Sequence, residues 1–150
     1  MSGAVTGWTG RQFLAWGGAC CEDTTRGGLA YTPATGTWRA IPAAPLAART
    51  RASGAWTGKE LVVAGGWDYH KAFRDAAAYN PATGTWRKLP PVPGTVTGWP
   101  ALWDGREVLF LSTSSARRVG RPRGARDTGF GLAGPCSATE VSPAKYRRSC

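Results

Sequence analysis

The sequence has little of what most metal and catalytic sites need. Its 150 residues include one histidine, His70, so two imidazoles cannot cooperate in a metal site or a proton relay. The four cysteines show no CxxC spacing, which argues against a zinc ribbon. The adjacent pair Cys20 and Cys21 lies beside Glu22 and Asp23, but a metal there would need further ligands. We therefore expect reduced thiols, no metal and no cofactor.

Long apolar runs are also missing. The first ten residues, MSGAVTGWTG, contain neither a basic segment nor a hydrophobic stretch, so they do not resemble a secretory signal. Nowhere does the chain approach the roughly 18 consecutive apolar residues of a membrane-spanning helix. These absences favour a cytoplasmic protein without a membrane partner.

Acidic residues are scarce in the last quarter of the chain. The formal net charge is +10; residues 1–111 hold 11 Lys or Arg and 7 Asp or Glu, whereas residues 112–150 hold 8 and 2. The last segment also has few large apolar residues and cannot bury a core of its own. We expect residues 112–150 to be a disordered tail rich in arginine and glycine.

What the sequence has in abundance is repetition, at an offset of 48 residues. YTPATGTWRAIP at 31–42 returns as YNPATGTWRKLP at 79–90. Without a gap, 16 of the 35 positions in 8–42 are identical in 56–90. Two copies of one structural unit explain this identity.

Each unit carries the signals of antiparallel strands. In the second unit, ELVVA at 60–64 is a short apolar run that ends at a glycine pair, as a buried strand often does. RASGAW at 51–56 can pair with it through a tight turn at Gly58. AAAYN at 76–80 and TWRKL at 85–89 are joined by a turn and complete a sheet of four strands.

One such sheet cannot bury both of its faces. Neighbouring copies must therefore pack face to face, through large residues such as Trp38 and Trp86. No helical period appears in residues 1–111. The predicted fold class is all-β.

In each unit a glycine pair is followed by a tyrosine and then by a tryptophan. These residues are Gly17, Gly18, Tyr31 and Trp38 in the first unit and Gly65, Gly66, Tyr79 and Trp86 in the second. Their order and spacing resemble the kelch repeat. The resemblance implies that each unit is a four-stranded blade of a β-propeller and that the protein is a binding or interaction module. It places blade 1 at 2–42, blade 2 at 43–90 and the first hairpin of a third blade at 91–111.

The pattern stops inside the third unit. WDGREVLFL at 103–111 matches the second unit at an offset of 47, but Ser112 and Thr113 stand where the glycine pair is expected. Two and a half blades do not close a ring, for which roughly four to eight are needed. We expect a fragment of a larger propeller, an interrupted reading frame, or a protomer that completes a ring by self-association.

The loop between the second and third strands of blade 2 is the leading binding candidate. It combines aromatic, cationic, anionic and imidazole groups at the sheet edge that forms one rim of a propeller. We predict that it contacts a protein or a small polar ligand; the alternative is a solvated loop without a ligand. Its candidate residues are Trp67, Asp68, Tyr69, His70, Lys71, Phe73 and Arg74.

Further arginines could belong to the same rim. Arg26 and Arg74 occupy equivalent places before the third strand of their blades, where they either bridge backbone carbonyls or hold a ligand carboxylate. Arg49 and Arg51 precede the first strand of blade 2 and either join the ligand site or are solvated.

Two other classes of function are carried as alternatives. RRVGRPRG at 117–124 resembles an AT-hook, an arm that places arginines in a narrow minor groove of DNA. Nucleic-acid attachment would rest on Arg117, Arg118, Arg121 and Arg123. The resemblance to the kelch family also admits a propeller enzyme acting on carbohydrate, similar to galactose oxidase or to a sugar mutarotase. Because no nucleophile or oxyanion site stands beside His70, we name no catalytic residue and expect a non-catalytic protein.

Overall fold

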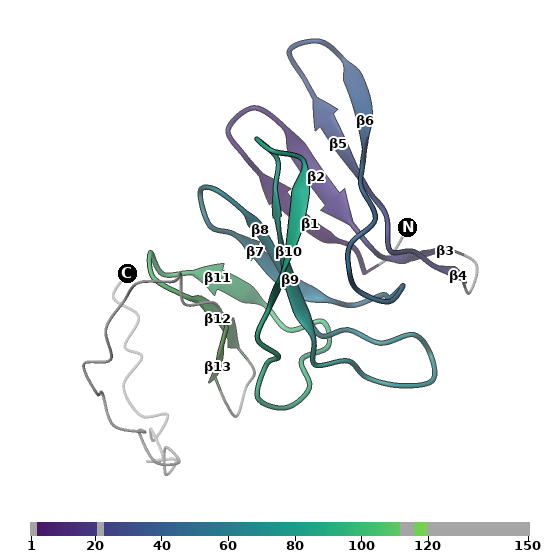
Figure 1. Ribbon diagram of the computed structural model, residues 1–150, viewed down its shortest axis with the longest axis vertical. Helices are drawn as coiled ribbons and strands as arrows, with labels where there is room; N and C mark the ends of the chain where they lie inside the picture. Colours follow the sequence, from purple (N-terminus) through teal and green to yellow (C-terminus); the bar gives the residue numbers. More distant parts are fainter. Residues whose placement is uncertain (1–2, 21–22, 112–115, 120–150) are drawn as a thin grey trace, which may run out of the picture.

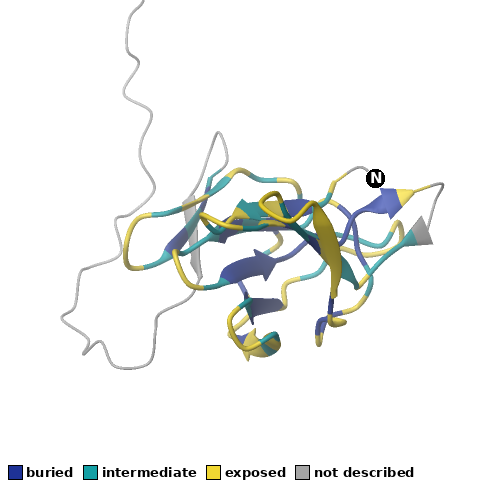
Figure 2. Cartoon of the chain, turned by 90° about the horizontal axis from the view of Figure 1, so that it is seen from above, coloured by how far each residue is buried: buried dark blue, intermediate teal, exposed yellow. Residues whose placement is uncertain are grey.

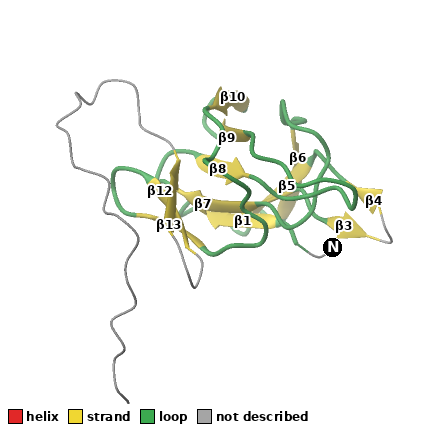
Figure 3. Cartoon of the chain, turned by 90° about the horizontal axis from the view of Figure 1, so that it is seen from below, coloured by secondary structure: helices red, strands yellow, loops and turns green. Residues whose placement is uncertain are grey.

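The computed structural model describes residues 3–20, 23–111 and 116–119. Within these ranges the chain forms strands and loops and no helix (Figure 3). The predicted all-β fold is therefore confirmed. None of the described residues forms a helix with the length and apolar character needed to span a membrane.

The first unit forms an antiparallel sheet in the order β1-β2-β5-β6 (Figure 1). Its strands are β1 Val5–Trp8, β2 Phe13–Trp16, β5 Gly28–Thr32 and β6 Thr37–Ile41. A ribbon of two short strands lies between β2 and β5 in the chain. These strands, β3 Ala19–Cys20 and β4 Asp23–Thr24, were not predicted.

The second unit repeats this topology, in the order β7-β8-β9-β10. Its strands are β7 Ser53–Trp56, β8 Leu61–Ala64, β9 Ala76–Asn80 and β10 Thr85–Leu89. The last two strands occupy the residues that were predicted for them. The apolar run and the turn signals were therefore sufficient to locate the strands of this unit.

A third sheet is formed by β11 Ala101–Trp103, β12 Val108–Leu111 and β13 Ala116–Val119. The first two strands are the predicted third hairpin. β13 lies in the predicted tail, and for residues 116–119 that prediction is wrong. The segment pairs with β12 from Leu111↔Ala116 to Val108↔Val119, because the unpaired edge of β12 offers backbone hydrogen bonds to a segment of any composition. Residues 112–115 and 120–150 lie outside the described part of the chain.

The three sheets stack face to face, with an apolar core at each interface. The core between the first and second sheets includes Val5, Leu14, Trp16, Ile41, Leu61, Val63 and Tyr79. The core between the second and third includes Val62, Ala64, Leu89, Val108 and Phe110. Figure 2 shows these buried strands in dark blue inside the stack, with exposed residues in the hairpin turns. Over the described residues, the stack of three sheets does not close into a ring.

Trp86 and Trp38 occupy the same position in the repeat but have different surroundings. The ring of Trp86 lies 5.7 Å from that of Trp16 in the first sheet, and its indole N–H donates to the Pro42 carbonyl at 2.8 Å. This confirms the predicted packing of Trp86 between sheets. Trp38 is 61% exposed, because no described sheet covers the outer face of the first sheet.

The glycine pair at the end of β8 joins the second sheet to the linker that follows it. Gly65 and Gly66 have φ angles of +63° and +89°, which favour glycine. The Gly65 N–H donates to the Asp75 carbonyl at 3.1 Å, and the Gly66 N–H donates to the Val96 carbonyl at 2.8 Å. A Cβ atom at Gly65 would lie 2.0 Å from the Val96 carbonyl oxygen. This position therefore needs glycine for both its backbone angle and the close approach of the linker.

Candidate binding rim

The connections between sheets gather on one side of the stack. In Figure 1 the hairpin turns point to the upper left, and the loop at 66–75 lies with the linkers at 42–52 and 90–100 toward the lower right. Backbone hydrogen bonds join these segments: Thr50 and Trp67 exchange two, at 2.9 and 3.0 Å. We call this loop and the two linkers the rim. The predicted candidate loop lies on it.

A tight turn organises the loop. The Asp68 carboxylate accepts hydrogen bonds from the backbone N–H groups of Lys71 at 2.9 Å and His70 at 3.1 Å. These bonds, that of Lys71 foremost, hold the pKa of Asp68 below its ordinary value of 3.8. Asp68 therefore stabilises the loop conformation, which presents Tyr69, His70 and Lys71 as exposed residues.

An aromatic and cationic cluster forms where the loop meets the linker. The rings of Trp67 and Tyr69 lie 5.3 Å apart, and the Arg51 guanidinium carbon lies 6.0 Å from the centre of the Trp67 ring. Among the described residues, two that are not glycine have positive φ: Arg51 at 49° and Tyr69 at 72°. Each costs on the order of 1–3 kcal/mol, a strain that is often found at functional sites. Both strained residues belong to this cluster.

Arg49 is a structural residue rather than a ligand contact. Its side chain is fully buried and donates to the carbonyls of Ala47 at 2.8 Å and Gly65 at 3.0 Å. It also forms a two-point ion pair with Asp75, at 2.6 and 3.0 Å, and lies 4.0 Å from the centre of the Phe73 ring. The prediction that Arg49 contacts a ligand is wrong, because the folded loop covers its guanidinium completely. Arg49 instead links the first linker to the loop.

Arg26 and Arg74 are exposed at equivalent places and join their sheets to the following linkers. The Arg74 Nε donates to the Val92 carbonyl at 3.2 Å, and the Val92 N–H donates back to the Arg74 carbonyl at 2.8 Å. The Arg26 carbonyl accepts the Ala44 N–H at 3.1 Å and the Trp16 indole N–H at 3.0 Å. The contact of Arg74 matches the predicted carbonyl-bridging alternative.

A groove lies beside the cluster, along the first strands of the three sheets. It has a volume of about 360 Å³ and is lined by residues 3–6, 51–54 and 98–101. Arg51 belongs to both the groove and the cluster. The groove was not predicted, since its walls come from segments about 48 residues apart. The signal that could have located it is that all three segments precede or begin the first strand of a unit.

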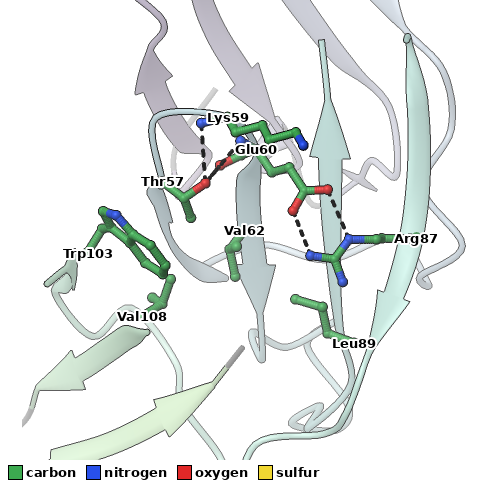
Figure 4. A pocket seen from close by; sticks show the side chains of 8 residues that line it. All are labelled: Thr57, Lys59, Glu60, Val62, Arg87, Leu89, Trp103 and Val108. Carbon is green, nitrogen blue, oxygen red and sulfur yellow. Dashed lines mark hydrogen bonds and ion pairs between the residues drawn. The ribbon is translucent and has the colours of Figure 1, made fainter. Parts of the chain in front are cut away.

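A second hollow lies near the hairpin turns, between the second and third sheets (Figure 4). Its volume is about 180 Å³, and its walls are mostly apolar, with Trp103 and Val108 from the third sheet. Glu60 and Arg87 form a two-point ion pair at one side, at 2.9 and 2.6 Å. Arg87 lowers the pKa of Glu60 below its ordinary value of 4.5, and Glu60 raises the pKa of Arg87. This pair, which was also not predicted, joins β10 to the turn before β8.

The remaining candidates are only partly placed. Arg117 and Arg118 belong to β13, where they pair with Phe110 and Leu109 of β12, and Arg121 and Arg123 lie outside the described residues. Nucleic-acid attachment therefore stays a prediction. In the part of the chain that the structure describes, no three His, Cys, Asp or Glu residues gather in a way that could hold a metal ion.

Comparison with known proteins identifies the repeat. A protein-family model described as the kelch motif matches residues 48–93, which include all four strands of the second sheet. No match to this chain was found among the curated proteins. The matched residues contain Gly65, Gly66, Tyr79 and Trp86, which carried the resemblance in the sequence. The chain therefore contains a kelch motif at residues 48–93, within a stack of antiparallel sheets that does not close into a ring over the described residues.

Proposed function

We propose that this chain is a binding module that contacts an acidic segment of a partner protein through its rim. The observation that carries the proposal is the cluster of Arg51, Trp67 and Tyr69 at the edge of the groove. Tyrosine, tryptophan and arginine are the residues most enriched at the energetic centres of protein interfaces. The groove gives a peptide segment a place to lie beside them.

The charges of the loop favour an acidic partner. Asp75 is paired with Arg49, and Asp68 accepts hydrogen bonds from its own turn. Both acidic groups of the loop are therefore engaged within the protein. The cations Arg51 and Lys71 are exposed at the rim, so they can attract carboxylates of a partner.

Selection from a phage library of random dodecamer peptides tests this proposal. We expect the peptides enriched on the full chain to be rich in Asp and Glu. Reversing two rim charges, in the double variant Arg51→Glu and Lys71→Glu, should weaken binding of a selected synthetic peptide about tenfold or more, because attraction becomes repulsion. Isothermal titration calorimetry measures the affinity.

The matched control reverses two exposed charges in hairpin turns on the other side of the stack. Arg11→Glu and Lys59→Glu change the net charge by the same amount but lie far from the rim in the fold. Their double variant should bind the selected peptide as the unmodified chain does. Equal weakening by both double variants would show that net charge, rather than the rim, governs binding and would refute the proposal.

A further inference from the structure

The outer face of the first sheet is apolar and uncovered in the described chain. A row of aromatic residues crosses it, because Trp8 pairs with Phe13, Phe13 with Tyr31, and Tyr31 with Trp38. Trp8 is 52% exposed and Trp38 is 61% exposed. None of the residues that alternate onto this face in β1, β2, β5 and β6 is charged. An uncharged aromatic surface of this kind is typical of a protein–protein contact.

The same row in the second sheet shows what covers such a face. There the equivalent residues are Trp56, Leu61, Tyr79 and Trp86. Leu61 and Tyr79 are fully buried, and all four pack against the first sheet. In the second sheet, this row of residues is therefore covered by the face of the first sheet that carries Leu14 and Trp16. We infer that the outer face of the first sheet accepts an equivalent face of another such sheet.

The third sheet has a face equivalent to the one with which the first sheet covers the second. In β12, Val108 and Phe110 face the second sheet, so Leu109 and Leu111, which alternate with them, lie on the far side. In β11, Leu102 is on this far side and is 43% exposed. In the repeat, Leu109 and Leu111 are equivalent to Leu14 and Trp16 of the first sheet, which pack against the second sheet. We call this surface of the third sheet its far face.

We propose that two copies of this chain associate head to tail, with the outer face of the first sheet of each copy packed on the far face of the third sheet of the other. Each contact would repeat the packing seen inside the chain between the first and second sheets. Two copies supply six sheets, which falls within the roughly four to eight blades of closed propellers. A twofold axis then closes the assembly, since both contacts are made at once.

Charge substitutions at the two ends of the stack test this pairing. In the full chain at tens of micromolar, we expect light scattering to give twice the chain mass of 15.8 kDa. Trp38→Asp and Leu102→Asp should each give the monomer mass, because each places a carboxylate in both contacts. Arg39→Asp, on the other face of β6, is the matched control and should remain dimeric.

Mixing the two variants distinguishes the proposed pairing from others. Trp38→Asp keeps an intact far face and Leu102→Asp keeps an intact outer face, so the mixture can form one normal contact. We expect native mass spectrometry to show a mixed dimer that forms at least about tenfold more tightly than either variant with itself. Circular dichroism checks the fold, and Thr6→Asp, on the same face as Trp38, replaces Trp38→Asp if that variant does not fold.

Three results would overturn the proposal. A monomeric unmodified chain would mean that a different partner, or another part of a longer protein, covers the face. A dimer that Trp38→Asp disrupts but Leu102→Asp does not would mean that two outer faces pack on each other. Failure of the mixed pair to associate better than the separate variants would show that the two faces do not meet.

Discussion

Arg49→Ala is expected to lower the free energy of unfolding by about 3 kcal/mol. The substitution removes the donors of two carbonyls, those of Ala47 and Gly65, and leaves a cavity where the guanidinium was. Loss of the ion pair with Asp75 contributes less to this destabilisation, since 49% of the Asp75 side chain is exposed and water can solvate its carboxylate when Arg49 is gone. Urea unfolding followed by tryptophan fluorescence measures the loss.

Arg74→Ala is the matched control for Arg49→Ala. Arg74 is exposed and its side chain makes a single hydrogen bond to a carbonyl, so its loss should cost about 0.5–1.5 kcal/mol or less. Equal losses for the two variants would contradict the structural role of Arg49. They would mean that its side chain is solvated, which was one of the alternatives open from the sequence.

Gly65→Ala is expected to be the most damaging small substitution in the second sheet. A φ of +63° costs a residue with a Cβ about 1–3 kcal/mol. The new Cβ would also lie 2.0 Å from the Val96 carbonyl oxygen, so the linker must move, which adds about 1–3 kcal/mol or more. The sum, about 2–6 kcal/mol, is a large fraction of the roughly 5–15 kcal/mol that stabilises an ordinary domain.

Gly84→Ala separates the two costs of Gly65→Ala. Gly84 has nearly the same φ, +69°, but nothing lies within 4 Å of its added Cβ. It should therefore show the conformational cost alone, and the difference between the two variants measures the close approach of the linker. Thermal unfolding followed by circular dichroism gives both values. Equal stabilities would show that the linker does not pack against the glycine pair.

The elements that could be predicted from the sequence are those with local causes. The strands at 76–80 and 85–89 are defined by the turn between them, and the hairpin before them is defined by the turn at Gly58 and the apolar run at 60–64. The repeat then predicted the stacking, which the structure shows for Trp86 on the first sheet; its counterpart Trp38 is exposed because no described sheet covers it. Because the same strand and turn signals occur in both units at an offset of 48 residues, they predict the strands more strongly than either unit does alone.

The elements that were missed depend on contacts between distant segments. Arg49 and Arg51 look alike in the sequence, yet one is buried and the other is exposed, since the loop at 66–75 folds over only the first. β13 forms because the backbone of residues 116–119 can hydrogen-bond to the free edge of β12. The composition of these residues gave no sign of a strand. The groove has walls from three units and no motif of its own.

Nuclear Overhauser effects between the first and second sheets test most directly that repeated sheets stack face to face. A Cβ built on Gly7 of β1 would lie 2.9 Å from a methyl carbon of Leu61 in β8, and the rings of Trp16 and Trp86 are 5.7 Å apart. We predict cross-peaks between the Gly7 α-protons and the Leu61 methyl groups, and between the two indole rings. A spectrum with strong cross-peaks inside each sheet but none between these pairs would contradict the stacked arrangement.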